Sequence, residues 1–346
     1  MTADHWSEVE EAVAFAVECV NGDRDPLNDR ERADGNQYVL RMMAAVAQSS
    51  TVRLDPDRPG FLTMLDTVRY LGAAGPDIDY DVSSVRPGAT YRITGRRGGA
   101  SYVGIAVYAG AGESGATAIV RSVDVDSIVA ADGTFRYEFS HPDAARVIIR
   151  QYFHDRSVQA RGEWTIEKCD GAVSGPVAYA SAVEMDFRIA GMARSLRWNA
   201  QLNRLWTPER RERPNEFVRQ TSDDIVAAIP NPDVNYSFTW WRVAEGEVGV
   251  IDLTPPETVY WAAQLCDRWF QCFPERSTNL NDRQVVRRPD GSVRIVIADS
   301  NPGTDNWLDN GGHRTGVVFF RWLHADVTKQ PRIRVMSVAE FAELAD

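Results

Sequence analysis

Short motifs occur in the same order in the two halves of this 346-residue chain, which indicates a repeated structural unit. Residues 76–80 (PDIDY) correspond to residues 232–236 (PDVNY), and Tyr102 corresponds to Tyr260. Further pairs that recur in order are residues 132–133 with 290–291 and residues 147–150 with 318–321. The constant order and nearly constant spacing favour a duplication. The alternative is two unrelated sandwiches that share common turn motifs.

The pattern of apolar residues predicts helices followed by short strands in each half. Helices are expected at residues 7–20 and 38–47, from Pro59, over 177–206, and from Ser337. Strands are expected at 91–94, 102–108, 118–120, 135–139, 146–153 and 163–167, and again at 236–243, 249–253, 259–265, 285–288, 293–298 and 316–323. We predict an α+β, mainly β protein with two tandem antiparallel, jelly-roll-like β-sandwiches, each preceded by helices. The expected domains are residues 1–172 and 173–346.

The second half contains a longer polar segment than the first, residues 299–314 (DSNPGTDNWLDNGGHR). Loops of this kind, held by a rigid scaffold, often carry function. Within it, Asp309 precedes His313, and a carboxylate that accepts a hydrogen bond from one ring nitrogen would prepare the other nitrogen as a general base. Alternatively, Asp309 and Asn310 shape the loop while His313 bonds to the backbone or contacts a ligand.

Tryptophan is frequent in this chain, with 10 residues, and several lie in the second half. We predict a substrate pocket walled by Trp261, Trp269 and Trp307. Its polar contacts would come from Tyr260, Gln264, Asn281 and Asn306. The competing interpretation is that the tryptophans fill the core of a sandwich.

Two further expectations concern arginines and strand faces. Arg268 would stabilise negative charge that develops beside the catalytic pair Asp309 and His313. Arg150 and Arg321 occupy matching positions in the two halves, where a structural ion pair in each half explains them better than two active sites. Alternation along a strand places Tyr260 and Gln264 on one face and Trp261 on the other. In the same way Arg150 and Tyr152 face away from Gln151 and Phe153.

The composition argues against several classes of partner. Lys and Arg number 38 against 49 for Asp and Glu, and the net charge of −11 does not favour nucleic acid or an anionic membrane. No apolar run approaches the roughly 20 residues that a membrane-spanning helix needs. The first residues do not resemble a secretory signal, and the four cysteines show no paired spacing. We therefore expect a cytoplasmic protein without disulfides.

Common catalytic motifs do not occur in the sequence. It contains no GxSxG, Walker or HExxH pattern, and its five histidines share no ligand spacing. We therefore predict no metal site and no cofactor.

The C-terminal region, about residues 230–330, resembles proteins that carry the domain of unknown function 1214. The resemblance rests on Tyr260-Trp261, Arg268-Trp269, residues 290–293 (DGSV), 302–308 (PGTDNWL), Gly312 and 319–322 (FFRW). It implies a β-sandwich, often beside a second β-rich domain, and oligomers in some relatives. The first half, particularly residues 150–155, looks like the N-terminal region of long bacterial members. The resemblance implies no particular reaction.

The leading functional hypothesis is a cytoplasmic small-molecule enzyme, a hydrolase or lyase acting on a carbohydrate-like or polycyclic apolar substrate. The first alternative is a non-catalytic small-molecule binding protein with the same aromatic pocket. The second is a structural protein whose exposed aromatic side chains form a homo-oligomer interface.

Overall fold

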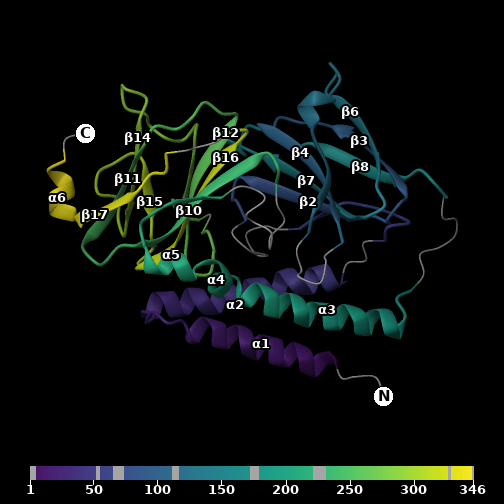
Figure 1. Cartoon of the computed structure of the whole chain (residues 1–346), viewed down its shortest axis with the longest axis horizontal. Coiled ribbons are helices and arrows are strands. Elements are labelled where there is room, and N and C mark those ends of the chain that lie inside the picture. Colours follow the sequence, from purple (N-terminus) through teal and green to yellow (C-terminus); the bar gives the residue numbers. More distant parts are fainter. Residues whose placement is uncertain are drawn as a thin grey trace.

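The computed structural model describes residues 5–51, 55–64, 74–110, 117–171, 179–220, 231–273, 275–325 and 329–344. It contains two β-sandwiches side by side above a layer of long helices (Figure 1). The helices are α1 (His5–Asn21), α2 (Asp29–Thr51), α3 (Ala182–Ala200), α4 (Leu202–Trp206), α5 (Pro208–Glu212) and α6 (Val338–Ala342). This architecture confirms the predicted fold class.

The first sandwich pairs a five-stranded sheet with a three-stranded sheet. The larger sheet has the order β1 (Leu62–Thr63), β2 (Ile78–Ser84), β7 (Ala144–Tyr152), β4 (Tyr102–Ala109) and β5 (Ile119–Asp124). The smaller sheet has the order β6 (Thr134–Ser140), β3 (Thr90–Arg96) and β8 (Glu163–Lys168), and a 3-10 turn, Val125–Ser127, follows β5.

The second sandwich repeats this plan. Its larger sheet has the order β9 (Val218–Gln220), β10 (Val234–Arg242), β16 (Thr315–Leu323), β12 (Tyr260–Cys266) and β13 (Asn279–Asn281). Its smaller sheet has the order β15 (Trp307–Asp309), β14 (Val293–Ala298), β11 (Glu247–Leu253) and β17 (Ile333–Ser337).

The strand orders of the two sandwiches match when the repeated motifs are aligned. The PDIDY motif leads into β2 and the PDVNY motif into β10, and these strands pair with β7 and β16, which carry the recurrent Arg-ended runs. One strand has no counterpart: β15, from the longer polar segment, pairs in parallel with β14. The repeat predicted from the sequence therefore corresponds to a repeated fold.

The three long helices α1, α2 and α3 form one shared layer rather than one group for each sandwich. Residues of α1, α2 and α3 share a single hydrophobic cluster, which includes Val20, Tyr38, Leu196 and, from the second sandwich, Trp269. Gly35 makes room for this tryptophan, because a Cβ atom there would lie 2.8 Å from the Trp269 ring. The ring of Trp269 thus fastens the helix layer to the second sandwich.

Several predicted boundaries are wrong for physical reasons that the structure makes plain. The second helix starts at Asp29, well before residue 38, because its polar first turns are buried at Glu31 and Asp34. The strand predicted at residues 285–288 is irregular, since Val286 bonds to the side chain of Asn306 instead of to a strand. The long helix over 177–206 is interrupted at Gln201, and its first residues, 177–178, lie outside the described residues.

At the chain ends the helix predictions differ in outcome. The C-terminal helix is confirmed with its capping box, in which Ser337 and Glu340 bond reciprocally. Ser7, expected as a cap, lies inside α1. Pro59 itself is not helical, and most of the segment after it, residues 65–73, lies outside the described residues.

Each sandwich has its own hydrophobic core between its two sheets. In the second, Trp261 packs against Phe320 and Trp322, and the last two rings are stacked with centroids 5.1 Å apart. The predicted alternation is confirmed there, because Tyr260 and Gln264 face away from this core. In the first sandwich Phe153 points into the core, whereas Tyr152 points out of it.

The outward faces of the two larger sheets pack against each other. A third apolar cluster joins Ile78, Tyr102 and Tyr152 of the first sandwich to Val234, Tyr260, Ala262 and Leu323 of the second. Two hydrogen bonds cross this boundary reciprocally: Tyr260 Oη donates to Asp77 Oδ2 at 2.9 Å, and Tyr102 Oη donates to Asp233. Each half therefore supplies one donor and one acceptor at equivalent positions.

Arg150 and Arg321 are buried at this boundary, also at equivalent positions. Arg150 donates to Tyr108 Oη at 2.7 Å and lies 5.9 Å from the centre of the Tyr80 ring. Arg321 donates to Gln264 and lies 5.8 Å from the centre of the Tyr236 ring. Among these contacts the guanidinium groups meet aromatic and amide partners, an arrangement that the sequence-based expectation of carboxylate pairs did not include.

Removal of one inter-sandwich hydroxyl should destabilise the fold. In Tyr260→Phe the Asp77 carboxylate loses a donor, so the free energy of unfolding should fall by about 1.5–3 kcal/mol in urea denaturation. Tyr102→Phe should behave alike because Asp233 loses its donor. Tyr179→Phe is the control, since that side chain is 99% exposed. Effects on the two buried variants no larger than on the control would contradict a stabilising role of the reciprocal bonds.

Candidate functional site

The predicted Asp309–His313 pair does not form. His313 is buried, and its Nε2 lies 2.9 Å from Asp34 Oδ2 on α2. Asp309 instead accepts a hydrogen bond from the backbone N–H of Gly311 at 2.7 Å, which shapes the loop. The alternative interpretation of Asp309 as a loop-shaping residue therefore describes its contacts better.

The first turns of α2 hold the long polar segment in place. Asn28 Nδ2 donates to the carbonyl of Gly312 at 3.0 Å, and Glu31 Oε1 accepts from the backbone N–H of Arg314 at 3.2 Å. Together with the contact of Asp34 with His313, these bonds dock the loop onto the helix layer. The three-residue spacing of Asn28, directly before α2, and of Glu31 and Asp34, within it, was the available signal for this contact.

The surroundings of His313 are too confined for a substrate. A cavity of about 10 Å³ lies between His313, Asp309, Asp267, Phe273 and their neighbours. This volume accommodates about one water molecule. Burial raises the pKa of the Asp267 carboxyl to about 6, against the opposing effects of His313 and of several hydrogen bonds.

Arg268 forms a buried ion pair instead of facing a ligand. Its guanidinium donates to Glu31 Oε1 at 2.7 Å and to the carbonyl of Asp25 at 3.0 Å. The side chains of Arg268 and Glu31 are each only 1% exposed. This pair joins the loop after β12 to the start of α2.

The three tryptophans predicted to wall one pocket lie in three separate clusters. Trp261 belongs to the core of the second sandwich, and Trp269 to the helix layer. Trp307 packs near α6 and donates from Nε1 to the carbonyl of Ala298 at 3.0 Å. The described residues therefore form no shared aromatic pocket from these side chains.

The four predicted polar contacts are also dispersed. Tyr260, Gln264 and Asn281 lie at the boundary between the sandwiches, where Asn281 Nδ2 donates to Asp77 Oδ2 at 2.9 Å. Asn306 lies elsewhere and bonds to backbone groups of Val286 and Arg294, so it fastens the segment before β14.

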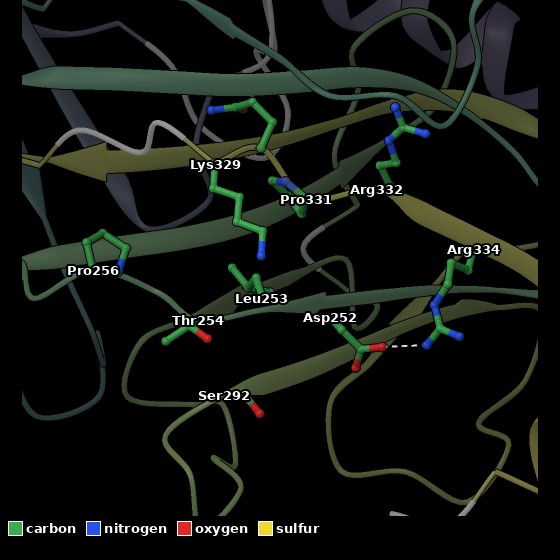
Figure 2. A pocket seen from close by; sticks show the side chains of 10 residues that line it. Asp252, Leu253, Thr254, Pro256, Ser292, Lys329, Pro331, Arg332 and Arg334 are labelled. Atoms are coloured by element: carbon green, nitrogen blue, oxygen red, sulfur yellow. Dashed lines mark hydrogen bonds and ion pairs between the residues drawn. The ribbon is translucent and has the colours of Figure 1, made fainter.

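A larger pocket lies on the second sandwich, at a place that sequence reasoning did not indicate. It has a volume of about 700 Å³ and lies beside β11 and β17. Figure 2 shows the side chains that line it. The lining residues are Asp252, Leu253, Thr254, Pro256, Ser292, Lys329, Gln330, Pro331, Arg332 and Arg334. Lys329 extends into this pocket toward Leu253 (Figure 2).

The lining of this pocket is rich in positive charge. Lys329, Arg332 and Arg334 line it together with a single carboxylate, that of Asp252. Asp252 is already engaged by Arg334 at 2.5 Å, by Arg294 at 2.8 Å and by Arg288 at 3.1 Å. Burial alone would raise the pKa of Asp252, but its hydrogen bonds to arginines outweigh this effect and lower it. The carboxylate therefore stays ionised. Glu216, outside the lining, lies 4.0 Å from Arg332, so Asp252 and Glu216 together still leave Lys329, Arg332 and Arg334 in excess.

This pocket was not predicted from the sequence because its lining residues form no recognisable motif and come from distant segments. Arg332 directly precedes an unpredicted strand, β17, and Arg334 lies within it, whereas Asp252 lies near the end of a predicted strand far away in the chain. Alternating arginines in an otherwise acidic chain were the available signal.

The described part of the chain shows neither a metal cluster nor a membrane helix. It contains no group of three or more His, Cys, Asp or Glu side chains that could hold a metal ion. Among the described helices, none is long and apolar enough to cross a membrane. The compartment itself stays a prediction.

The chain is similar to bacterial proteins of unknown function. A family model described as a protein of unknown function, DUF1254, matches residues 214–331. An uncharacterized protein from Burkholderia cenocepacia has a crystal structure with a TM-score of 0.88 at 26% identity, and 97% of each chain is covered. The VPA0106 protein from Vibrio parahaemolyticus shares the fold with a TM-score of 0.50 at 9% identity, over 94% of this chain and 100% of that one. No curated protein matches.

These findings correct the family named from the sequence. The matching model is DUF1254, not the domain of unknown function 1214, whereas the broader likeness to bacterial proteins of unknown function holds. The motifs behind the resemblance prove to be structural: Asp290 caps a turn through Ser292, and Asn306 ties backbone segments together. Related sandwich proteins of different families can share residues that form turns, so such residues do not distinguish one family from another.

The Asp34 carboxylate should make stability depend on pH. Burial would raise its pKa, but His313 and Arg30 outweigh this effect and hold the pKa below the usual value. Stabilisation from this group is therefore complete above about pH 4, the ordinary carboxyl pKa, and is lost as the pH falls below it. In urea unfolding from pH 3 to pH 6, the stability gap between wild type and Asp34→Asn should shrink toward pH 3. A gap that does not change with pH would contradict this.

Loss of the buried guanidinium should be costly. Arg268→Met leaves Glu31 buried without its partner, and we expect the free energy of unfolding to fall by about 3–5 kcal/mol. The control is Arg213→Met, which breaks a surface pair whose arginine side chain is 75% exposed and which should cost no more than about 1 kcal/mol. Similar small losses in both variants, measured by chemical denaturation, would disprove a structural role for Arg268.

Proposed function

We propose that this protein binds a small anionic molecule in the pocket beside β11 and β17, without transforming it there. The observation that carries the proposal is the excess of cationic side chains in a hollow of ligand size. The volume of about 700 Å³ falls within the roughly 300–1,000 Å³ usual for small-molecule sites. A cluster of Lys and Arg in a chain of net charge −11 would attract an anion locally.

The chemical character of the lining limits the kinds of ligand that the pocket can bind. Arg332 and Lys329 are suited to a carboxylate or phosphate group, which arginine binds through two parallel hydrogen bonds. Leu253, Pro256 and Pro331 offer an apolar wall beside them. We therefore infer a ligand with one anionic group and a short apolar body, in place of the carbohydrate-like or polycyclic substrate expected from the sequence.

A binding role suits this pocket better than catalysis. Its described lining includes no histidine or cysteine, and the one carboxylate, Asp252, is held by three arginines. A carboxylate whose pKa is lowered in this way is a poor general base. The proposal thus follows the binding-protein alternative, but with a cationic pocket in place of an aromatic one.

Binding should depend on ligand charge and on two side chains. We expect hexanoate and phenyl phosphate to bind the full chain in isothermal titration calorimetry, and hexanol and phenol to bind far more weakly. Lys329→Gln combined with Arg332→Gln should lower affinity for the anions at least about tenfold, because charge-assisted bonds contribute about 1.5–3 kcal/mol each. Added salt should weaken binding.

The matched control is Arg121→Gln, which removes an exposed arginine from the first sandwich. This variant should bind both anions as the wild type does. Equal binding of charged and neutral compounds, or equal affinity in the double variant, would refute the proposal.

A further inference from the structure

A chain of hydrogen bonds links a serine, a histidine and an aspartate at the boundary between the sandwiches. Ser101, directly before β4, places its Oγ 2.6 Å from Nδ1 of His154, which follows β7. His154 Nε2 lies 2.8 Å from Oδ1 of Asp282, which follows β13 in the second sandwich. These distances fall within the range for a nucleophile, its base and the group that orients the base.

Gln159 fixes the direction of the hydrogen bonds at the serine. Its Oε1 accepts from the backbone N–H groups of His154 at 2.7 Å and Asp155 at 2.9 Å, which determines how the amide is oriented. Its Nε2 therefore donates, to the carbonyl of Gly99 at 2.9 Å and to Ser101 Oγ at 3.0 Å. Since Ser101 Oγ accepts this bond, its own hydrogen is available for His154.

The same logic assigns the protons of the histidine. If Ser101 donates to Nδ1 of His154, that nitrogen carries a lone pair, and the proton of the neutral ring is on Nε2. Nε2–H then donates to Asp282, as in an orienting carboxylate. The backbone N–H of Trp261 also bonds to Asp282 Oδ1 at 3.2 Å and holds the carboxylate in place.

Comparison of the two halves shows which of these residues the contact between the sandwiches explains and which it does not. On the other side of the boundary, His324 Nε2 lies 3.4 Å from Asp124 Oδ2, although the strand register aligns these two residues with Phe153 and Asn281. A histidine–carboxylate contact therefore occurs on both sides of the boundary, at positions displaced by one residue. At the position equivalent to Ser101, directly before β12, stands Val259. Contact between the sandwiches thus accounts for the two histidines, but it does not require a hydroxyl at Ser101.

We propose that Ser101 is an activated nucleophile toward small carboxylic esters, with His154 as its base and Asp282 as the group that orients the base. Ser101 is partly exposed, and the segment that follows His154, residues 155–158, is exposed, so the serine lies close to the protein surface. The nucleophile and base come from the first sandwich and the orienting carboxylate from the second, so the centre exists only when the sandwiches are docked.

In the reaction, Ser101 Oγ forms a bond to the ester carbonyl carbon while its proton passes to Nδ1 of His154. The bond between that carbon and the alcohol oxygen then breaks, and the leaving alcohol takes the proton from Nδ1. Water attacks the acylated serine by the same route, which releases a carboxylic acid and restores Ser101. The contacts of Ser101 with His154 and of His154 with Asp282 make the hydroxyl of Ser101 more nucleophilic. A probe that reacts with nucleophilic serines is therefore the appropriate test.

Diisopropyl fluorophosphate tests the serine directly, because Oγ attack on phosphorus expels fluoride and leaves a stable adduct. Mass spectrometry of the full chain should find one adduct, on Ser101, and none in Ser101→Ala. His154→Gln should slow the labelling at least about 100-fold, the usual contribution of a general base. The wild type should also hydrolyse p-nitrophenyl acetate faster than Ser101→Ala.

Asp124→Asn provides the matched control for a purely structural effect. Asp282→Asn and Asp124→Asn each weaken one histidine contact between the sandwiches, and urea denaturation measures that loss in both. Only Asp282→Asn should slow the labelling of Ser101, by at least about tenfold. Absence of an adduct on the wild type, labelling that persists in Ser101→Ala, or equal slowing in the two aspartate variants would overturn the proposal.

Discussion

The two sandwiches meet through the outer faces of their larger sheets, and the polar groups buried there must find partners within the protein. Tyr260 bonds to Asp77 across this boundary, and Tyr102 bonds to Asp233 in return. Burial beside a carboxylate raises the pKa of both tyrosines, so their hydroxyls remain neutral donors. This contact fixes the orientation of the sandwiches, and with it the histidine–carboxylate pairs on either side.

The repeated fold could be predicted from the sequence because its signals are local. Asp-Gly turns, alternating strands and the Ser337–Glu340 cap depend on neighbours in the chain, and these elements lie where they were expected. The recurrent motifs at residues 76–80 and 232–236 lead into equivalent strands, since each must bring an aspartate to the same place in its own half. The start of α2 was missed because polar residues on a helix normally face solvent, whereas Glu31 and Asp34 face the second sandwich.

The candidate sites could not be predicted because they depend on contacts between distant segments. His313 lies close to Asp309 in the sequence, yet its partner is Asp34 on α2. The basic pocket combines the end of β11 with the segment before β17, and Ser101 meets Asp282 only through the docking of two sandwiches. The many tryptophans in the second half of the sequence were interpreted as a pocket, but large aromatic side chains in a sandwich protein mostly fill its cores.

The reciprocal Tyr–Asp bonds resemble the contacts of an isologous dimer interface. In such an interface, a first residue of one subunit contacts a second residue of the other, and the same contact occurs again with the subunits exchanged. In a homodimer every change would appear twice. Because both copies belong to one polypeptide, each can evolve separately. The covalent link thus permits asymmetry: a hydroxyl at Ser101 opposite a methyl-bearing Val259, and an added strand, β15, in one copy alone.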